Sequence, residues 1–121
     1  MDPVLFHNNE EGRQAFVDLA SRAVLWIADY YRNIENYPVR SQVLPGDIYK
    51  QFPAQFPAQP VTDDEVFRIL QEVIIPGMTH WQHPGFYAFF PGNTSFPSIV
   101  AEMVTAGMSA QCMLWESSPA A

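Results

Sequence analysis

The feature that most constrains the fold is a run of apolar residues repeated at three- and four-residue steps between residues 10 and 36. This spacing predicts a long helix with one apolar stripe, which Trp26 and Tyr30 widen. Glu10 and Glu11 lie near the expected N-terminus, where the helix dipole stabilises negative charge. Such a helix needs a covering surface, from other helices of the chain or from a second copy. The stripe residues are Phe16, Leu19, Ala20, Ala23, Val24, Ile27, Ala28 and Tyr31.

Residues 37–61 form a proline-rich segment whose backbone is predicted to be extended and irregular. Prolines occupy positions 38, 45, 53, 57 and 60, and the sequence QFPA occurs twice in residues 51–58. Each proline fixes φ and removes an amide donor, which disfavours regular structure. We interpret the segment as a connector, or as an arm that packs its phenylalanines on a neighbouring surface. A proline-motif ligand for a signalling domain is the weaker alternative.

Two shorter helices are predicted after the connector. Thr62 and Glu65 have the spacing of a capping box at the start of the first of them, and Pro76 and Gly77 end it. The other helix is predicted to begin near Ser95, with a proline in its first turn. The apolar face of the first comprises Val66, Ile69, Leu70, Val73 and Ile74.

The whole chain is therefore predicted to be mainly α. It divides into an N-terminal long helix (1–36), a proline-rich connector (37–61) and a helical and aromatic-loop region (62–121). With 121 residues, of which 48% are hydrophobic, the chain is long enough for one domain. Thirteen acidic residues against six basic give a formal net charge of -7, which disfavours binding to phosphate backbones.

The sequence shows neither a signal peptide nor a membrane-spanning segment. The first residues lack the basic and apolar regions of a signal peptide, and no apolar run approaches the ~20 residues that span a bilayer. We therefore expect a soluble, cytoplasmic protein that binds neither nucleic acid nor membrane. The single cysteine, Cys112, excludes an internal disulfide, and its apolar neighbours predict a buried side chain.

Few residues form a recognisable catalytic pattern. His80 and His83 have an H-x-x-H spacing, which would bind a metal if both lay on one helix. Pro84 and Gly85 disfavour a helix there, so no metal site is predicted. The only lysine, Lys50, lies in the proline-rich connector, a poor setting for the buried amine that Schiff-base chemistry needs. No catalytic set is predicted within this chain.

The richest local feature is the aromatic loop, residues 81–91, where aromatic residues are mixed with prolines and a glycine. Such a loop could line a flat apolar pocket for a planar ligand, or form part of an aromatic core. Composition alone favours the core and leaves both interpretations open. The aromatic residues are Trp81, Phe86, Tyr87, Phe89 and Phe90.

The aromatic loop resembles the N-terminal part of the group II pyridoxal-phosphate-dependent decarboxylases, most closely the aromatic-L-amino-acid and tyrosine decarboxylase branch. The resemblance rests on separate stretches that keep their order and spacing, and it covers nearly the whole chain after residue 12. These stretches are Tyr37-Pro38-Val39 with Val43-Leu44-Pro45-Gly46, Pro76-Gly77-Met78-Thr79-His80-Trp81, Pro84 with Phe86-Tyr87-Ala88-Phe89-Phe90-Pro91, and Trp115 with Ser118-Pro119-Ala120-Ala121.

The resemblance implies the N-terminal helical arm of an aspartate-aminotransferase-type (fold type I) enzyme, whose α/β large domain is absent from this chain. It also implies a homodimer formed through the N-terminal helices, pyridoxal 5'-phosphate in the full-length enzyme, and an L-amino acid, preferably aromatic, as the small-molecule substrate. The Schiff-base lysine belongs to the absent domain. This segment is therefore expected to bind no cofactor and to be inactive alone.

By the same resemblance, several residues contribute to the substrate pocket, two of them to the pocket of the other subunit. Three positions depart from the family's animal members, because Gly92 replaces a threonine, Gln111 an isoleucine and Met113 a phenylalanine. Catechol or indole specificity is therefore not implied, and the amino acid stays open. The expected substrate-binding residues are Trp81, Phe89, Phe90 and Pro91 within the subunit, and Gln111 and Met113 across the dimer.

Two other functions remain as alternatives. The first is an independent helical interaction or dimerisation module without enzymatic activity. The second is a metal or small-ligand site built on His80, His83 and the aromatic loop.

Overall fold

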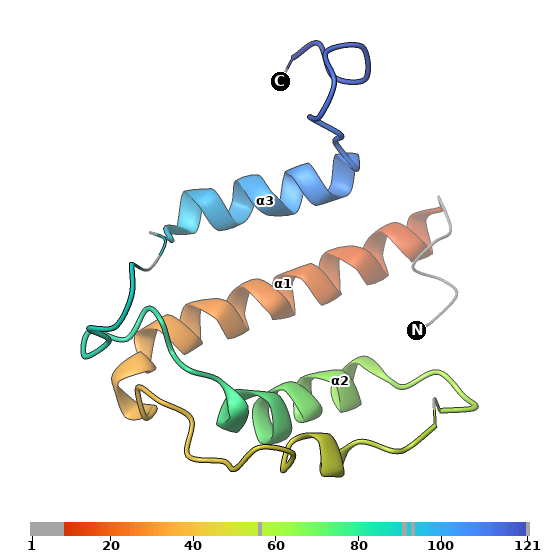
Figure 1. Cartoon of the computed structure of the whole chain (residues 1–121). Coiled ribbons are helices and arrows are strands. Elements are labelled where there is room, and N and C mark those ends of the chain that lie inside the picture. The colour runs from red at the N-terminus through yellow and green to blue at the C-terminus, as the bar shows by residue number, and fades with distance from the viewer. Residues whose placement is uncertain (1–8, 56, 91, 93, 121) are drawn as a thin grey trace. The chain divides into compact units, whose positions relative to one another are not determined.

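The computed structural model describes residues 9–55, 57–90, 92 and 94–120, and every regular element among them is helical (Figure 1). The prediction of a mainly α chain is therefore confirmed. The chain divides into two compact units, Met1–Tyr87 and Ala88–Ala121. In the part of the chain that the structure describes, no helix is long and apolar enough to cross a membrane.

Helix α1 (Glu10–Arg32) is the long helix that the apolar periodicity predicts. It begins where the side chain of Asn9 accepts a hydrogen bond from an amide of the first turn at 2.8 Å. It ends before residue 36, and a 3₁₀ turn, η2 (Ile34–Asn36), follows. Pro38 explains this end, because a proline holds the preceding residue in extended backbone, and Tyr37 has φ −89° and ψ 150°.

Helix α2 (Asp63–Ile69) continues into a π-helical turn, η4 (Leu70–Ile74), and then a 3₁₀ turn, η5 (Ile75–Gly77). Pro76 has no amide hydrogen and cannot continue a helical ladder, and the backbone becomes extended at Met78. The predicted end of this helix is therefore confirmed, although its last two turns are not α-helical.

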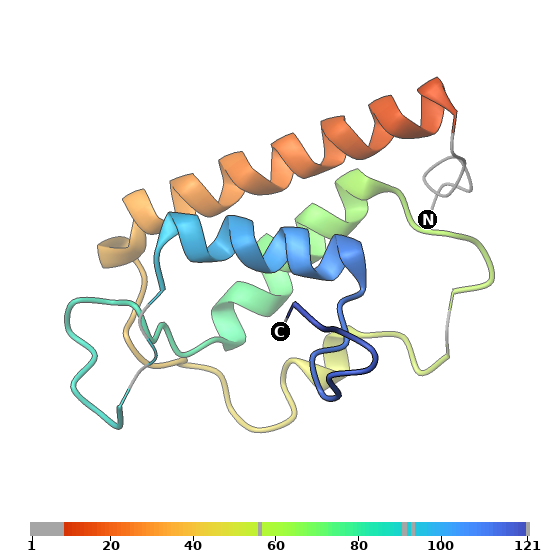
Figure 2. The same ribbon diagram turned by 90° about the horizontal axis from the view of Figure 1, so that it is seen from above.

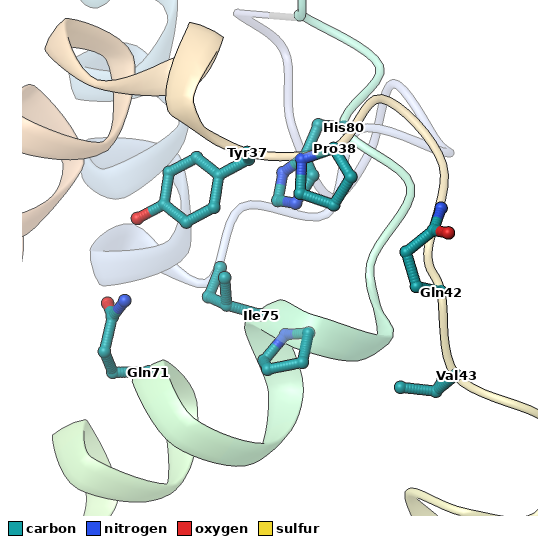
Figure 3. Close-up of a pocket in the computed structure, with 8 residues that line it drawn as sticks. Tyr37, Pro38, Gln42, Val43, Gln71, Ile75 and His80 are labelled. Carbon is teal, nitrogen blue, oxygen red and sulfur yellow. The ribbon is translucent and has the colours of Figure 1, made fainter.

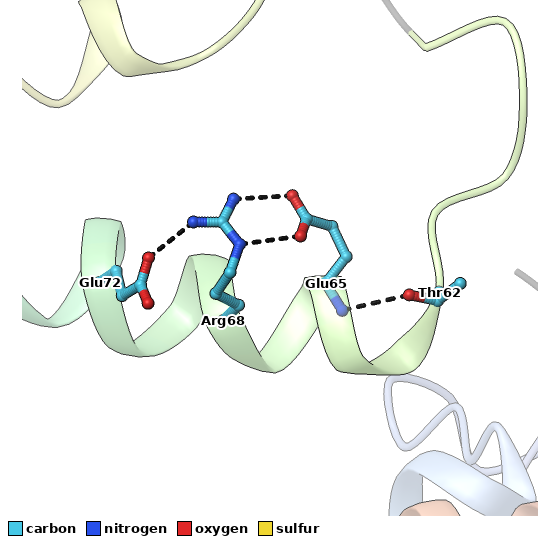
Figure 4. Close-up of polar contacts among 4 residues, drawn as sticks. All are labelled: Thr62, Glu65, Arg68 and Glu72. Atoms are coloured by element: carbon cyan, nitrogen blue, oxygen red, sulfur yellow. Dashed lines mark hydrogen bonds and ion pairs between the residues drawn. The ribbon is translucent and has the colours of Figure 1, made fainter.

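Figure 4 shows how α2 begins. The Thr62 hydroxyl accepts a hydrogen bond from the Glu65 amide at 3.3 Å, as the predicted N-cap requires. The carboxylate of Glu65 is engaged by Arg68 instead of returning to Thr62, with hydrogen bonds of 2.7 and 2.8 Å. These bonds lower the pKa of Glu65. The prediction of a capping box is therefore correct for Thr62 and wrong for the Glu65 side chain.

Figures 1 and 2 show α1 and α2 side by side within the first unit. Arg22 of α1 lies 4.2 Å from the centre of the Phe67 ring and forms an ion pair with Asp64. One turn further along α1, the Trp26 indole donates a hydrogen bond to Gln71 at 3.2 Å. Only part of the apolar surface of α1 is covered in this way. Large apolar side chains that stay exposed are Phe16, Val17, Val24 and Leu25.

The proline-rich connector is irregular, as predicted, apart from a 3₁₀ turn, η3 (Tyr49–Gln51). It packs against η5 at Gly77, where an added Cβ would lie 2.8 Å from Ile48 Cγ1. Glycine therefore allows these two segments to pack directly. Ile34 and Ile75 are the apolar side chains that the described residues bury.

Helix α3 (Phe96–Met108) is the main element of the second unit. Ser95 and Ser98 form a reciprocal capping box and a proline occupies the first turn, so the predicted start near Ser95 is confirmed. Ser109 ends the helix in the left-handed conformation, with φ 49°. Five large apolar side chains of α3 are exposed, namely Phe96, Val100, Met103, Val104 and Met108.

The residues after α3 form turns, and Cys112 lies among them. Its side chain is exposed, so the prediction that it is buried is wrong. The apolar neighbours that suggested burial are exposed as well, namely Met113, Leu114 and Trp115. An apolar sequence indicates burial only where another surface covers it.

Candidate functional site

His80 is the polar side chain that the described residues bury, with 2% of its surface exposed. Its Nδ1 lies 2.7 Å from the Tyr30 hydroxyl, and its ring stacks on Tyr37 with centroids 4.9 Å apart. Burial, with a smaller effect of His83, lowers the pKa of His80. Burial, with smaller effects of Tyr31 and Tyr37, raises the pKa of Tyr30. Both groups are therefore neutral near pH 7, and they share a hydrogen bond whose donor is set by the tautomer of His80.

Residues 80–86 form consecutive turns that bring two aromatic rings together. The His83 amide donates to the His80 carbonyl at 3.0 Å, and the Phe86 amide donates to the His83 carbonyl at 2.9 Å. The rings of Trp81 and Phe86 stack with centroids 5.0 Å apart and planes inclined by 27°. Trp81 remains about half exposed, so the pair offers an accessible aromatic surface.

A cavity of about 390 Å³ lies beside His80 (Figure 3). Its walls combine rings and aliphatic side chains, with the amides of Gln42 and Gln71 on different sides. Neither a lysine, nor a cysteine, nor a carboxylate belongs to this lining, so the cavity is suited to packing and contributes no nucleophile. Of the expected substrate-binding residues that the structure describes, none lines it. The lining residues are Tyr37, Pro38, Gln42, Val43, Gln71, Ile75, Pro76 and His80.

Both histidines of the H-x-x-H pair form hydrogen bonds with other residues of the chain. Nδ1 of His80 faces Tyr30, and Nδ1 of His83 accepts a hydrogen bond from the Gly85 amide at 2.8 Å. Among the described residues, no group of three histidine, cysteine or acidic side chains is placed to hold a metal ion. The two imidazoles therefore organise the loop around them.

Two of the expected pocket residues, Phe89 and Phe90, belong to the second unit, whereas Trp81 belongs to the first. Phe89 has φ 60°, a left-handed conformation that is costly for a residue with a bulky side chain. Phe90 is fully exposed. The third member of this group, Pro91, lies outside the described residues.

The remaining expected pocket residues, Gln111 and Met113, follow α3 and are exposed. Phe89 and Phe90 precede the same helix. Because α3 has 13 residues, its ends are separated by about 20 Å. The two pairs of residues therefore lie toward opposite ends of α3.

The only lysine of the sequence, Lys50, is exposed and forms an ion pair with Asp47 at 3.5 Å. Pyridoxal phosphate needs a lysine amine in an enclosed site, together with hydrogen-bond donors for its phosphate. The described residues do not provide this combination, so they do not fit the cofactor by themselves.

Sequence reasoning missed the environment of His80. Tyr30 was expected only to widen the apolar stripe of the long helix, and it contacts a residue 50 positions away. No short-range spacing indicates this pairing. A buried histidine among tyrosines was therefore not predictable from local pattern.

Comparison with known families gives a match to the pyridoxal-dependent decarboxylase conserved domain over residues 45–121. An aromatic-L-amino-acid decarboxylase of Catharanthus roseus is 44% identical over 108 residues, which are 89% of this chain and 22% of that protein. A phenylacetaldehyde synthase of Arabidopsis thaliana is 45% identical over 96 residues, which are 79% of this chain and 20% of that protein.

Solved structures agree with these relatives. Tryptophan decarboxylase of Catharanthus roseus, in complex with L-tryptophan, superposes with a TM-score of 0.84 and 42% identity, covering 95% of this chain and 24% of the other. For 4-hydroxyphenylacetaldehyde synthase of Rhodiola rosea, the TM-score is 0.82 and the identity is 33%. The superposition covers 88% of this chain and 23% of that one. The chain thus spans about a fifth to a quarter of the length of the proteins it matches.

Proposed function

Because the chain belongs to the pyridoxal-dependent decarboxylase family, we propose that it is the N-terminal segment of an amino-acid decarboxylase that acts on an aromatic L-amino acid. The segment supplies part of the substrate pocket and part of the dimer interface. The cofactor, pyridoxal 5'-phosphate, supplies the chemistry of decarboxylation and is held by residues outside this chain. The segment is therefore inactive alone.

The observation that supports this proposal best is the accessible aromatic surface of the segment. Trp81 stacks on Phe86 and stays half exposed, and Phe90 is fully exposed. Aromatic side chains bind a planar apolar substrate through offset or edge contacts of their rings. Relatives named for aromatic amino acids, tryptophan and tyrosine fit such a surface.

The dimer role is supported by the apolar side chains of α1 that stay exposed, such as Phe16, Val24 and Leu25. Exposed apolar patches of this kind mark interaction surfaces. Gln111 and Met113 lie toward the far end of α3 from Phe90, so one subunit is poorly placed to bring all of them to a single substrate. In a dimer, each pocket would combine Phe90 of one subunit with Gln111 and Met113 from the other.

The activity is tested with the intact protein, loaded with pyridoxal phosphate, on L-tryptophan, L-tyrosine and L-phenylalanine. Carbon dioxide and amine are expected for at least one of them. Phe90→Ala should lower kcat/KM about tenfold, the equivalent of ~1.4 kcal/mol of lost transition-state contact. Tyr49→Ala, at an exposed position of the connector, is the matched control and should leave kcat/KM unchanged.

Three outcomes would count against the proposal. Release of no carbon dioxide from any aromatic amino acid would remove the decarboxylase assignment. Equal activity of Phe90→Ala and the unchanged protein would remove the pocket role of Phe90. Aldehyde as the main product, instead of amine, would place the protein with the aldehyde synthases that it also resembles.

The dimer is tested by sedimentation of the intact protein. Val24→Glu places a charge in the exposed apolar surface of α1 and should shift the equilibrium toward monomer. Glu35→Gln changes an exposed polar residue of η2 and should leave the dimer intact. A dimer that tolerates Val24→Glu would show that this surface is not the interface.

A further inference from the structure

We infer that Tyr30 is a positioning residue for the Trp81–Phe86 pair, because its hydroxyl fixes His80 and so fixes the turns from which both rings extend. This inference rests on the proposed function, in which Trp81 belongs to the substrate pocket. It assigns a role in that pocket to a residue of α1 that does not itself belong to it.

The first step of the argument is the anchoring of His80 from several directions. The Tyr30 hydroxyl lies 2.7 Å from Nδ1, and Tyr37 stacks on one side of the imidazole. The His80 amide donates to the carbonyl of Val39 at 2.9 Å. The side chain and the backbone of His80 are therefore held by α1 and by the connector together.

The second step is the rigid link from His80 to the aromatic pair. Trp81 is the next residue in the chain, and the turns that close on the carbonyls of His80 and His83 lead directly to Phe86. These turns are compact, because a Cβ added at Gly85 would lie 3.1 Å from Nδ1 of His83. A shift of the His80 backbone would therefore move Trp81 and Phe86 together.

The third step is the separate role of the hydroxyl. The Tyr30 ring has packing contacts of its own, since it stacks on Trp26 with centroids 5.6 Å apart and planes 9° from parallel. A phenylalanine at position 30 would keep this stacking. Only the polar atom that orients the imidazole would be lost, and His80 would keep a buried Nδ1 without its hydrogen-bond partner.

The test compares Tyr30→Phe with Tyr37→Phe in the intact, cofactor-loaded protein. Tyr37→Phe is the matched control, because it also removes the hydroxyl of a ring that stacks on His80 but leaves the Tyr30–His80 hydrogen bond intact. Amide hydrogen exchange of residues 80–86 should become about two- to tenfold faster in Tyr30→Phe, the range that the net strength of one hydrogen bond gives. The control should leave this exchange unchanged.

Kinetics distinguish positioning from general stability. Tyr30→Phe should raise KM for the aromatic substrate severalfold, with kcat and the melting temperature nearly unchanged. A lower melting temperature with an unchanged KM would overturn the inference and leave a merely structural role. Faster exchange throughout the chain, and not only in residues 80–86, would do the same.

Trp81→Ala separates this inference from the proposed function. If Trp81→Ala raises KM but Tyr30→Phe does not, the inference fails and the pocket assignment stands. If Trp81→Ala leaves both KM and kcat unchanged, Trp81 is outside the pocket, and the assignment on which the inference rests fails first.

Discussion

In the first unit, side chains of α1 form hydrogen bonds and an ion pair with residues of α2 and of the segment after it. In the second unit, α3 begins with hydrogen bonds between nearby residues and exposes most of its apolar side chains. Arg22, Trp26 and Tyr30 each pair with a residue more than 40 positions away. Ser95 and Ser98, which start α3, are neighbours in sequence. The first unit is therefore defined by long-range contacts and the second by local ones.

This difference indicates where each unit obtains its stability. A helix of 13 residues is marginal in water without packing, even when it is well capped. The exposed apolar side chains of α3 are therefore expected to pack against another surface in the intact protein. The first unit contains the buried side chains of Ile34, Ile75 and His80.

The largest effect is expected from removing the central side chain of the first unit. His80→Ala leaves a cavity and a Tyr30 hydroxyl without its hydrogen-bond partner, so the free energy of unfolding of the intact protein should fall by about 2–4 kcal/mol. Urea denaturation measures it. His83→Ala, at a less buried ring of the same loop, should cost clearly less. If both variants lost the same free energy of unfolding, His80 would stabilise the first unit no more than His83 does.

A second prediction tests whether the face of α3 is covered in the intact protein. Val104→Glu should lower the free energy of unfolding by about 2 kcal/mol, because a charge would replace a side chain that packs against another surface. Glu102→Gln, on the same helix, is the control and should have little effect. Unchanged urea midpoints in Val104→Glu would mean that this face meets water, and the contrast between the units would weaken.

Two glycines test the comparison between the two units, because an added Cβ would clash at Gly77 but not at Gly107. Gly77→Ala should destabilise the protein by about 1–3 kcal/mol, since the new Cβ would meet Ile48. Gly107→Ala, in α3, has nothing within 4 Å of the new Cβ and should stabilise by about 0.5–1 kcal/mol. Thermal unfolding of both variants checks the opposite signs. A destabilising Gly107→Ala would reveal a surface packed closely against α3.

The smallest expected effect is a pH dependence of the first unit. Burial lowers the pKa of His80, so the folded state binds fewer protons than the unfolded state, whose histidine titrates near the ordinary value of about 6.5. Stability is therefore full above that value and is lost as the pH falls through the interval down to the lowered pKa. Urea midpoints between about pH 7.5 and 5.5 measure this loss. His80→Gln, which cannot titrate, should flatten the dependence, and an unchanged slope would assign it to other groups.

Local sequence signals predicted local structure well in this chain. The hydroxyls of Thr62 and Ser95 accept amide hydrogen bonds at the starts of α2 and α3, and the proline-rich connector is irregular. These features depend on backbone groups within four residues, which a pattern of neighbours can indicate.

Features that depend on distant partners were not predictable in this way. The Glu65 carboxylate could accept a hydrogen bond from the Thr62 amide or from Arg68. It binds Arg68, whose guanidinium forms two charge-assisted hydrogen bonds with it. Cys112 was expected to be buried because its neighbours are apolar, yet burial depends on a covering surface. The H-x-x-H spacing gave no hint that His80 meets Tyr30. The pocket residues that the resemblance implies include Trp81 of the first unit and Phe89 of the second, and their role in a pocket stays a prediction.

The four-residue spacing of Arg22, Trp26 and Tyr30 has a consequence for how the length of this chain can change in evolution. Each residue added to a helix turns everything after it by about 100°, so one insertion between Arg22 and Tyr30 would rotate the tyrosine away from His80. A deletion there would have the same effect in the opposite sense. The exposed residues 53–55 and 57–60 are under no such constraint, because an irregular loop absorbs an added residue at little cost. Homologous chains should therefore keep this part of α1 at constant length and vary in the connector.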